Sequence, residues 1–135
     1  MAVHFTGPLM VDGVEITSGG GGGGDVAITL ELDDISTLSS AYAVAPFAGT
    51  VNKIYSVIYG SIATADAFLT PRINAFAMTS GTITVANSGS GAGDIDSSTP
   101  SANNTIAAGD LLEVITNGAS TNTVRATITM VITPS

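Results

Sequence analysis

Few side chains in this sequence could perform chemistry, and those few are far apart. His4 is the single histidine and cysteine is absent, so neither a catalytic triad nor a thiolate metal site can be built from recognisable motifs. Asp33-Asp34 and the pair Asp94 and Asp96 could offer oxygens to Ca²⁺, but the twelve-residue EF-hand spacing is missing. A glycosidase needs two facing acids in a cleft lined for sugar, and the sequence has no tryptophan and three tyrosines. We predict no catalytic residue, no metal site and no cofactor.

The basic residues are equally sparse. Lys53, Arg72 and Arg125 stand against eleven acidic residues, and the formal net charge is -8. Three cations cannot form the stripe that neutralises a phosphate backbone, so we predict no nucleic-acid partner. Because acids are plentiful, we expect Lys53 and Arg125 each to meet a carboxylate, within the subunit or across an interface, in surface ion pairs worth about 0–1 kcal/mol.

The composition indicates one folded domain with an incomplete polar surface. A chain of 135 residues is long enough for one domain that buries roughly two-thirds of the surface of its unfolded form. With 44% hydrophobic and 10% charged residues, the chain is too apolar to be disordered and has too few charges to cover a soluble monomer. We therefore expect other subunits or partners to cover part of the surface.

The sequence also carries no signal for export or for a membrane. Residues 1–8 lack the basic and apolar regions of a secretory signal, and no apolar run approaches the ~20 residues that span a bilayer. We expect no membrane partner. The simplest interpretation is a protein made in a cytoplasm that either stays there or is packaged from there into something larger.

The clearest secondary structure lies late in the chain. Leu111–Thr116 and Thr123–Ile132 read as two strands joined by a polar loop over residues 117–122. The second strand alternates threonines and Arg125 with apolar residues, so one face seeks a core while the other tolerates water, as in a half-buried antiparallel sheet. The apolar residues of that strand are Val124, Ala126, Ile128, Met130 and Ile132.

Four further strands are predicted. Val26–Leu32 alternates apolar and polar residues, and Val51–Ile62 is rich in β-branched residues and tyrosine. Phe68–Met78 contains Pro71, which has no amide hydrogen and so belongs at a sheet edge or across a break. Thr82–Ala86 is the fourth strand. The segment Val51–Ile62 is expected to have two partly covered faces. One face carries Val51, Lys53, Tyr55, Val57 and Tyr59, and the other carries Ile54 and Ile58.

The remaining segments decide the fold class. Ile35–Ala45, which Pro46 ends, is compatible with a loop, a short helical turn or a strand. Asn87–Asn104 is rich in Ser, Gly, Asp and Asn and is interpreted as the long connection of the domain. Seven or eight short strands with frequent turn signals, and no helical periodicity, predict an all-β fold, an antiparallel β-sandwich with jelly-roll-like topology.

The N-terminal part is set apart by its glycines. Residues 1–18 form a candidate β arm, with Asp12-Gly13 as a turn signal, Gly19–Gly24 form a linker, and residues 25–135 form the sandwich domain. The arm could fold back on its own sandwich, or it could reach a neighbouring subunit or another partner and add a strand there, and we favour the second. The arm residues that we expect to contact a partner are Phe5, Leu9, Met10, Val11, Val14 and Ile16.

Several short segments together resemble one family. These are Ala107–Val114 with its Ala-Gly-Asp turn, the Ser88–Gly93 loop, the Thr121–Thr123 segment before the last strand, and the opening His4–Leu9. The chain is similar in these features to small structural proteins of tailed bacteriophages, in particular head decoration or cement proteins.

The resemblance implies a structural role without enzymatic activity. It implies a homotrimer on the outer capsid surface of a virion, between capsomers, with the major capsid protein as partner and the head stabilised as the result. The alternative is a β-sandwich associated with a phage tail or fibre that binds a host receptor or glycan. A calcium-dependent adhesion module is the third class.

Overall fold

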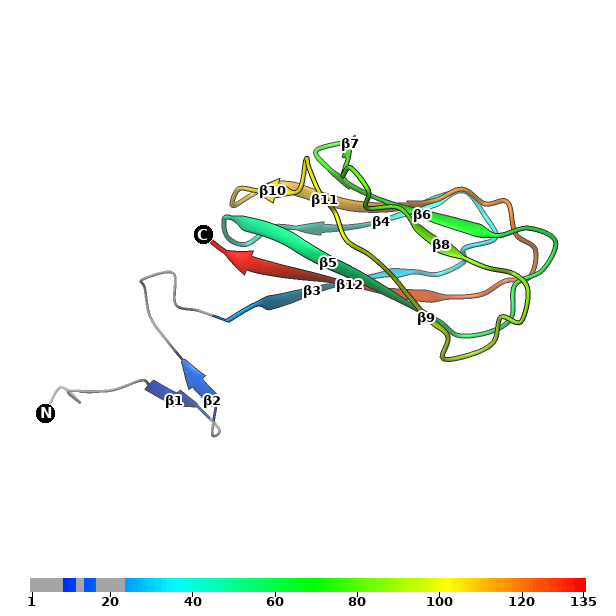
Figure 1. The fold of residues 1–135 in the computed structure, drawn as a ribbon, viewed down its shortest axis with the longest axis horizontal. Coiled ribbons are helices and arrows are strands. Elements are labelled where there is room, and N and C mark those ends of the chain that lie inside the picture. Colours follow the sequence, from blue (N-terminus) through cyan, green and yellow to red (C-terminus); the bar gives the residue numbers. More distant parts are fainter. Residues whose placement is uncertain (1–8, 12–13, 17–23) are drawn as a thin grey trace, which may run out of the picture.

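The computed structural model describes residues 9–11, 14–16 and 24–135. The body is a sandwich of two antiparallel sheets, seen nearly edge-on in Figure 1. The first sheet, here called the β12 sheet, has the strand order β3-β12-β5-β9, and β10 also pairs with β5. Its strands are β3 (Val26–Leu32), β5 (Gly49–Ile58), β9 (Ile95–Ser98), β10 (Thr105–Ile106) and β12 (Ala126–Pro134).

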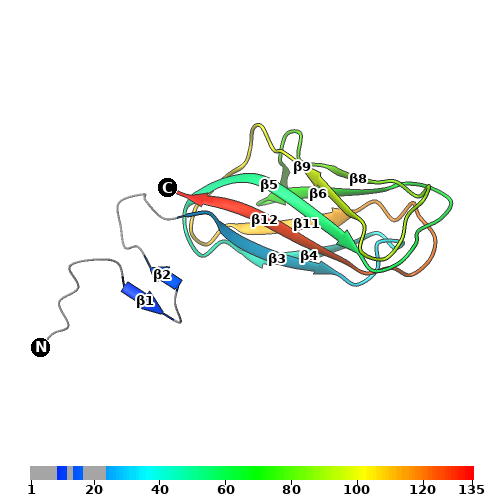
Figure 2. The same cartoon turned by 60° about the horizontal axis from the view of Figure 1, so that its bottom comes forward.

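The second sheet, here called the β11 sheet, lies across the back of the first one in Figure 2. Its order is β4-β11-β6, and β6 then pairs with β8 over its first half and with β7 at its end. Its strands are β4 (Ser39–Val44), β6 (Ala67–Ile73), β7 (Phe76–Ala77), β8 (Ile83–Val85) and β11 (Leu111–Thr116).

The topology is that of a jelly roll. The four-stranded order β3-β12-β5-β9 faces the four-stranded order β4-β11-β6-β8, so that the chain passes repeatedly from one sheet to the other. The predicted all-β fold and antiparallel sandwich are confirmed, and the described residues contain no helix.

The core lies between the sheets and is built from alternate residues of the long strands. All five apolar residues predicted for the inward face of the last strand are buried, from Val124 to Ile132. Opposite them in the β11 sheet lie buried side chains such as Leu69, Leu112 and Val114. The period-two pattern therefore identified the core face of β12 correctly.

The predicted faces of β5 are wrong at Val51. Val51 is fully buried, although we placed it on the side of Lys53 and Tyr55. The register explains the difference: Lys53 lies opposite Val131 but Val51 lies opposite Ile132, so the strand contains a β-bulge with one extra residue. A bulge reverses the alternation beyond it, which turns Val51 back into the core.

Two segments contain strands that the sequence did not single out, one predicted as a connection and the other compatible with a loop, a short helical turn or a strand. The predicted long connection Asn87–Asn104 includes β9, which pairs along the free edge of β5. The ambiguous segment Ile35–Ala45 includes β4, which pairs with β11 over its full length. The prediction for Pro71 is confirmed, because this residue lies in β6 between the part paired with β8 and the part paired with β7.

A tight turn leads into β11. The amide of Asp110 donates to the carbonyl of Ala107 (3.1 Å), and Gly109 takes a φ of 92°, a conformation that glycine adopts without steric cost. The Asp110 carboxylate also accepts a hydrogen bond from the Ala107 amide (2.8 Å). These bonds close the Ala-Gly-Asp turn and set the start of β11 at Leu111.

The arm contains a two-stranded antiparallel ladder. β1 (Leu9–Val11) pairs with β2 (Val14–Ile16), with Leu9 opposite Ile16 and Val11 opposite Val14. This is the hairpin that the Asp12-Gly13 turn signal predicts. Residues 17–23, which include most of the glycine linker, lie outside the described residues, so the division of the chain at the glycines stays a prediction.

Candidate functional site

The residues that could do chemistry do not assemble into a reactive site in the described part of the chain. His4 lies outside it. Within residues 9–11, 14–16 and 24–135, no group of three or more histidine, cysteine or acidic side chains could hold a metal ion. No helix in these ranges is long and apolar enough to cross a membrane.

In the first acidic pair, Asp33-Asp34, the Asp34 carboxylate stabilises a turn. The Asp34 carboxylate accepts hydrogen bonds from the Ser36 hydroxyl (2.6 Å) and the Ser36 amide (2.8 Å), and these bonds lower the pKa of Asp34. It also accepts a longer bond from the Val124 amide (3.4 Å). Asp34 thus ties the connection between β3 and β4 to the segment that leads into β12.

The second acidic pair lies at a sheet edge. Asp94 closes its own loop by accepting a hydrogen bond from the Gly91 amide (2.8 Å). Asp96 lies in β9 directly opposite Ser56 of β5. Burial raises the pKa of Asp96, and the negative charge of Asp94 adds to the effect. The Ser56 hydroxyl is buried and has no hydrogen-bond partner among the described residues.

The expected carboxylate partners of Lys53 and Arg125 are replaced by tyrosines within the subunit. Arg125 lies over the ring of Tyr59, 4.2 Å from its centroid. Lys53 lies 5.9 Å from the centroid of Tyr55 and donates a hydrogen bond to Thr99 (3.1 Å). Both contacts place a cation against the electron-rich face of an aromatic ring.

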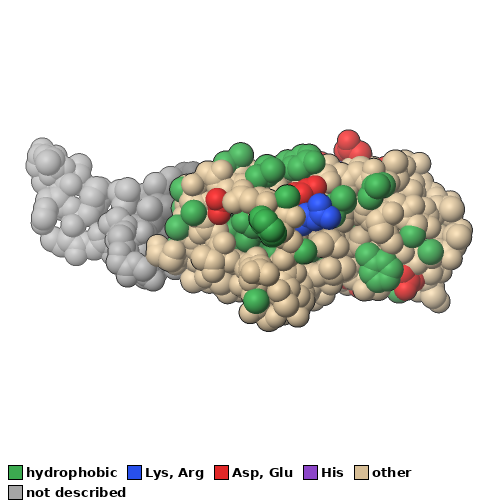
Figure 3. Space-filling view, turned by 90° about the horizontal axis from the view of Figure 1, so that it is seen from above, with side chains coloured by type: hydrophobic (Ala, Val, Ile, Leu, Met, Phe, Trp, Pro, Cys, Tyr) green, Lys and Arg blue, Asp and Glu red, His purple; other side chains and the backbone are tan. Residues whose placement is uncertain are grey.

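The outer face of the β11 sheet is apolar. It carries five of the ten exposed large hydrophobic side chains of the described residues. Figure 3 views this face, where hydrophobic side chains are spread along the molecule and a basic and an acidic side chain touch near the middle. We call this surface the apolar face, and its exposed hydrophobic residues are Leu38, Tyr42, Val44, Phe68 and Leu111.

In β4 the small side chains face the core and the large apolar side chains face solvent, which is the reverse of an ordinary edge strand. Its small residue Ala41 points inward and is buried, while Tyr42 and Val44 point outward and are 62% and 64% exposed. Val44 lies directly opposite Leu111 of β11, so two exposed aliphatic side chains are adjacent. Large apolar side chains turned to solvent in a contiguous group mark a surface that another molecule covers.

The charges in the middle of the apolar face neutralise each other. Arg72 and Glu113 form an ion pair (Nη1 to Oε1, 3.8 Å), and they lie opposite each other on β6 and β11. The Ser40 hydroxyl donates to the second oxygen of Glu113 (2.6 Å), and Glu113 is buried. The centre of this face therefore presents no net charge to a partner.

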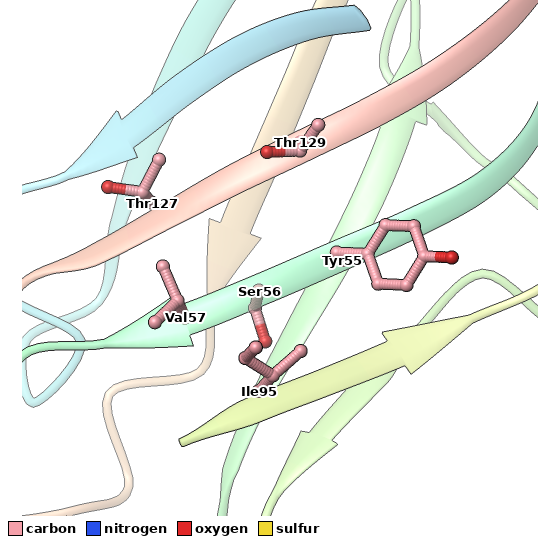
Figure 4. Close-up of a pocket in the computed structure, with 6 residues that line it drawn as sticks. All are labelled: Tyr55, Ser56, Val57, Ile95, Thr127 and Thr129. Carbon is pink, nitrogen blue, oxygen red and sulfur yellow. The ribbon is translucent and has the colours of Figure 1, made fainter. Parts of the chain in front are cut away.

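The outer face of the β12 sheet is different, because it carries hydroxyl groups, tyrosines and a shallow trough. The trough has a volume of about 310 Å³ and opens between β9, β5 and β12 (Figure 4). Along β5, Tyr55 and Val57 project into its rim, and Ile95 of β9 lies beside them. We call this hollow the trough, and its lining residues are Tyr55, Ser56, Val57, Ile95, Thr127 and Thr129.

The residues predicted to contact a partner from the arm are not tested. Phe5 lies outside the described residues. Leu9, Met10 and Val11 lie in β1, and Val14 and Ile16 lie in β2. Their contact with a partner stays a prediction.

Sequence reasoning missed both outer-face surfaces. In β4 the residues on both faces of the strand are apolar or small, so their alternation does not show which side chains face solvent. The size difference between Tyr42 and its alanine neighbours was the available signal. Ile95 was missed because it is the single large aliphatic residue in a segment that otherwise consists of polar or small residues.

Comparison with known proteins leaves the family open. No protein-family model and no curated protein matches the chain. Among solved structures, it is similar to CsCBM6-3 from Clostridium stercorarium, determined in complex with cellobiose. The two share 14% sequence identity over 73% of this chain and 70% of that chain, with a TM-score of 0.48. A similarity this distant carries no argument about function.

Proposed function

We propose that this protein is a non-enzymatic structural protein of a virion, which decorates the outer capsid surface between capsomers and stabilises the head. The major capsid protein is its partner, and the protein acts as a homotrimer. The resemblance of its sequence segments to phage decoration proteins suggests the role, and the jelly-roll body is compatible with it.

The observation that carries the proposal is the apolar face. A soluble monomer would place small or polar residues at the outward positions of β4, yet this strand exposes Tyr42 and Val44. Leaving such side chains in water forfeits about 25 cal/mol for each Å² of apolar surface that a partner would cover. A preassembled shell offers a broad surface against which this face could be buried.

The electrostatics of the face support the same proposal. An unpaired charge in the middle of a buried interface costs several kcal/mol. Here Arg72 and Glu113 are already paired within the subunit, so docking need not supply a counter-charge. This arrangement suits an apolar, uncharged partner surface.

The alternative function uses the opposite side of the sandwich. A module that binds a host receptor or glycan would require an aromatic platform, and the β12 sheet exposes Tyr55 and Tyr59. The two functions predict different contact faces, so variants that alter one face at a time separate them.

The test is a sedimentation assay with capsids of the virus that encodes the chain, prepared without this protein. Val44→Glu places a charge in the apolar face and should weaken attachment at least tenfold, about 1.4 kcal/mol. Thr29→Glu adds the same charge to the exposed outer face of the β12 sheet and should bind as the unaltered protein does. Equal binding by both variants, or no binding of the unaltered protein, would refute the proposal.

A further inference from the structure

We propose that the trough on the β12 sheet binds a neutral saccharide. The site is separate from the apolar face and does not depend on capsid attachment. It is formed by two rows of side chains that run across the strands. One row contains Thr127, Val57 and Ile95, and the next contains Thr129 and Tyr55, as the strand register requires.

The lining matches the two chemical faces of a sugar ring. Tyr55, Val57 and Ile95 supply apolar surface for the carbon-hydrogen face of a ring, and the threonines supply hydroxyl groups at the rim (Figure 4). Tyr55 is 42% exposed and Ile95 is 69% exposed, so both side chains are available to a ligand. The volume of about 310 Å³ lies at the lower limit of ligand pockets, which suits one or two sugar rings.

Charge complementarity selects a neutral ligand. None of the six residues that line the trough is charged. Charges of both signs lie at the margins. Lys53 lies against Tyr55 and Arg125 lies against Tyr59, while Glu31 accepts a hydrogen bond from Thr127 (3.2 Å) and Asp96 lies opposite Ser56, so neither sign dominates. The net charge of -8 further disfavours acidic saccharides, because like charges repel across the distances that salt leaves unscreened.

The strand pairing argues against a peptide in the trough. A peptide that docks on a sheet in extended form uses unpaired amide and carbonyl groups of an edge strand. The trough lies mainly over β5 and β12, and each of these strands is paired on both sides, β12 with β3 and β5, and β5 with β12 and β9. The inner strands therefore offer side chains but no free backbone to a ligand.

The neighbouring tyrosine holds one wall in place. Tyr59 shares a hydrogen bond with Thr127 (2.8 Å), and Arg125 stacks on the Tyr59 ring. Thr127 is thereby fixed by Tyr59 on one side and Glu31 on the other. Because the Thr127 side chain is already held in place, less conformational entropy is lost when a ligand binds against it.

The experiment uses the full chain labelled with ¹⁵N and a set of neutral disaccharides, namely lactose, maltose, cellobiose and diacetylchitobiose. Titration with at least one of them should shift the amide resonances of residues 55–57, 95 and 127–129. Tyr55→Ala should weaken that binding at least fivefold, since an aromatic contact contributes about 1 kcal/mol. Tyr42→Ala removes a more exposed tyrosine from the other sheet and should leave the binding unchanged.

Three results would overturn the proposal. The first is that no neutral disaccharide shifts the trough resonances, or that sialic acid and heparin fragments bind there instead. The second is equal loss of binding in the two tyrosine variants. The third is dissociation of the oligomer by Tyr55→Ala but not by Tyr42→Ala, measured by light scattering, because the trough would then be a contact between subunits. Sedimentation with capsids reports separately on the proposed function.

Discussion

Replacing Ile128 by alanine should destabilise the body strongly. Ile128 is fully buried near the middle of β12, directly opposite Leu30 on one side and Ser56 on the other. The change removes three carbons, and at ~0.8 kcal/mol for each buried carbon group the lost transfer free energy is about 2.4 kcal/mol.

The cavity that remains adds to this cost. A residual volume of roughly 50 Å³ contributes about 1.2 kcal/mol at ~24 cal/mol for each Å³. Together the two terms give about 3.5 kcal/mol, within the ~2–5 kcal/mol measured for such substitutions. Collapse is restricted because both neighbouring strands are paired along their length with β12.

The matched control is Thr127→Ala, one residue earlier on the opposite face. Thr127 bonds with Tyr59 and Glu31 at the surface, so its loss should cost less than about 1 kcal/mol. Urea unfolding at one fixed protein concentration, followed by circular dichroism, measures both variants. With a slope of about 1.5 kcal/mol per M, Ile128→Ala should lower the midpoint by about 2 M. Equal shifts for the two variants would show that the assigned faces of β12 are wrong.

Four further predictions concern assembly and the polar edge. Multi-angle light scattering should return a stable trimer at micromolar concentration, and a monomer would contradict this. Deleting residues 1–18 should leave the melting temperature of the body nearly unchanged and weaken capsid attachment at least tenfold; loss of the oligomer with normal decoration would contradict this. The folded-state pKa of Asp96 is raised, so the protonated carboxyl stabilises the fold at low pH, and this contribution is lost as the pH rises and the carboxyl ionises. Asp96→Asn should therefore raise the melting temperature at neutral pH but not below about pH 3.5. Ser56→Ala removes a buried hydroxyl that has no partner within the described part of the chain, and its melting temperature should equal or exceed that of the unaltered protein.

The parts of the fold that sequence patterns predict are those with strict alternation. β3 and β12 were identified with their core faces, because each has its large apolar residues mainly on one face. β11 was identified with its bounds, although both of its faces carry large apolar residues. β5 failed at one position because a bulge changes the phase without leaving a sequence signal. β9 failed because its pairing with β5 depends on backbone hydrogen bonds, which polar side chains such as Ser97 and Ser98 do not reveal.

The candidate surfaces were less predictable than the core. Whether an apolar side chain faces a neighbour in the fold or solvent depends on which strands pair, and the pairs here join distant segments. Tyr55 and Ile95 become neighbours only because β9 aligns with β5. Lys53 and Arg125 were expected to pair with acids, but Lys53 lies against Tyr55 of its own strand and Arg125 lies against Tyr59.

The position of β12 in the chain affects how the protein can be synthesised. β3 and β5 do not pair with each other, because β12 lies between them, and β12 is translated after both. At ~5–20 residues per second, the ~100 residues between Ile28 and its partner Met130 take about 5–20 s to emerge from the ribosome. During this interval the nascent chain carries apolar strands with unsatisfied edges, a condition that favours aggregation and chaperone binding. A chain that terminates before β12 should therefore be degraded or aggregate instead of forming a partial sandwich.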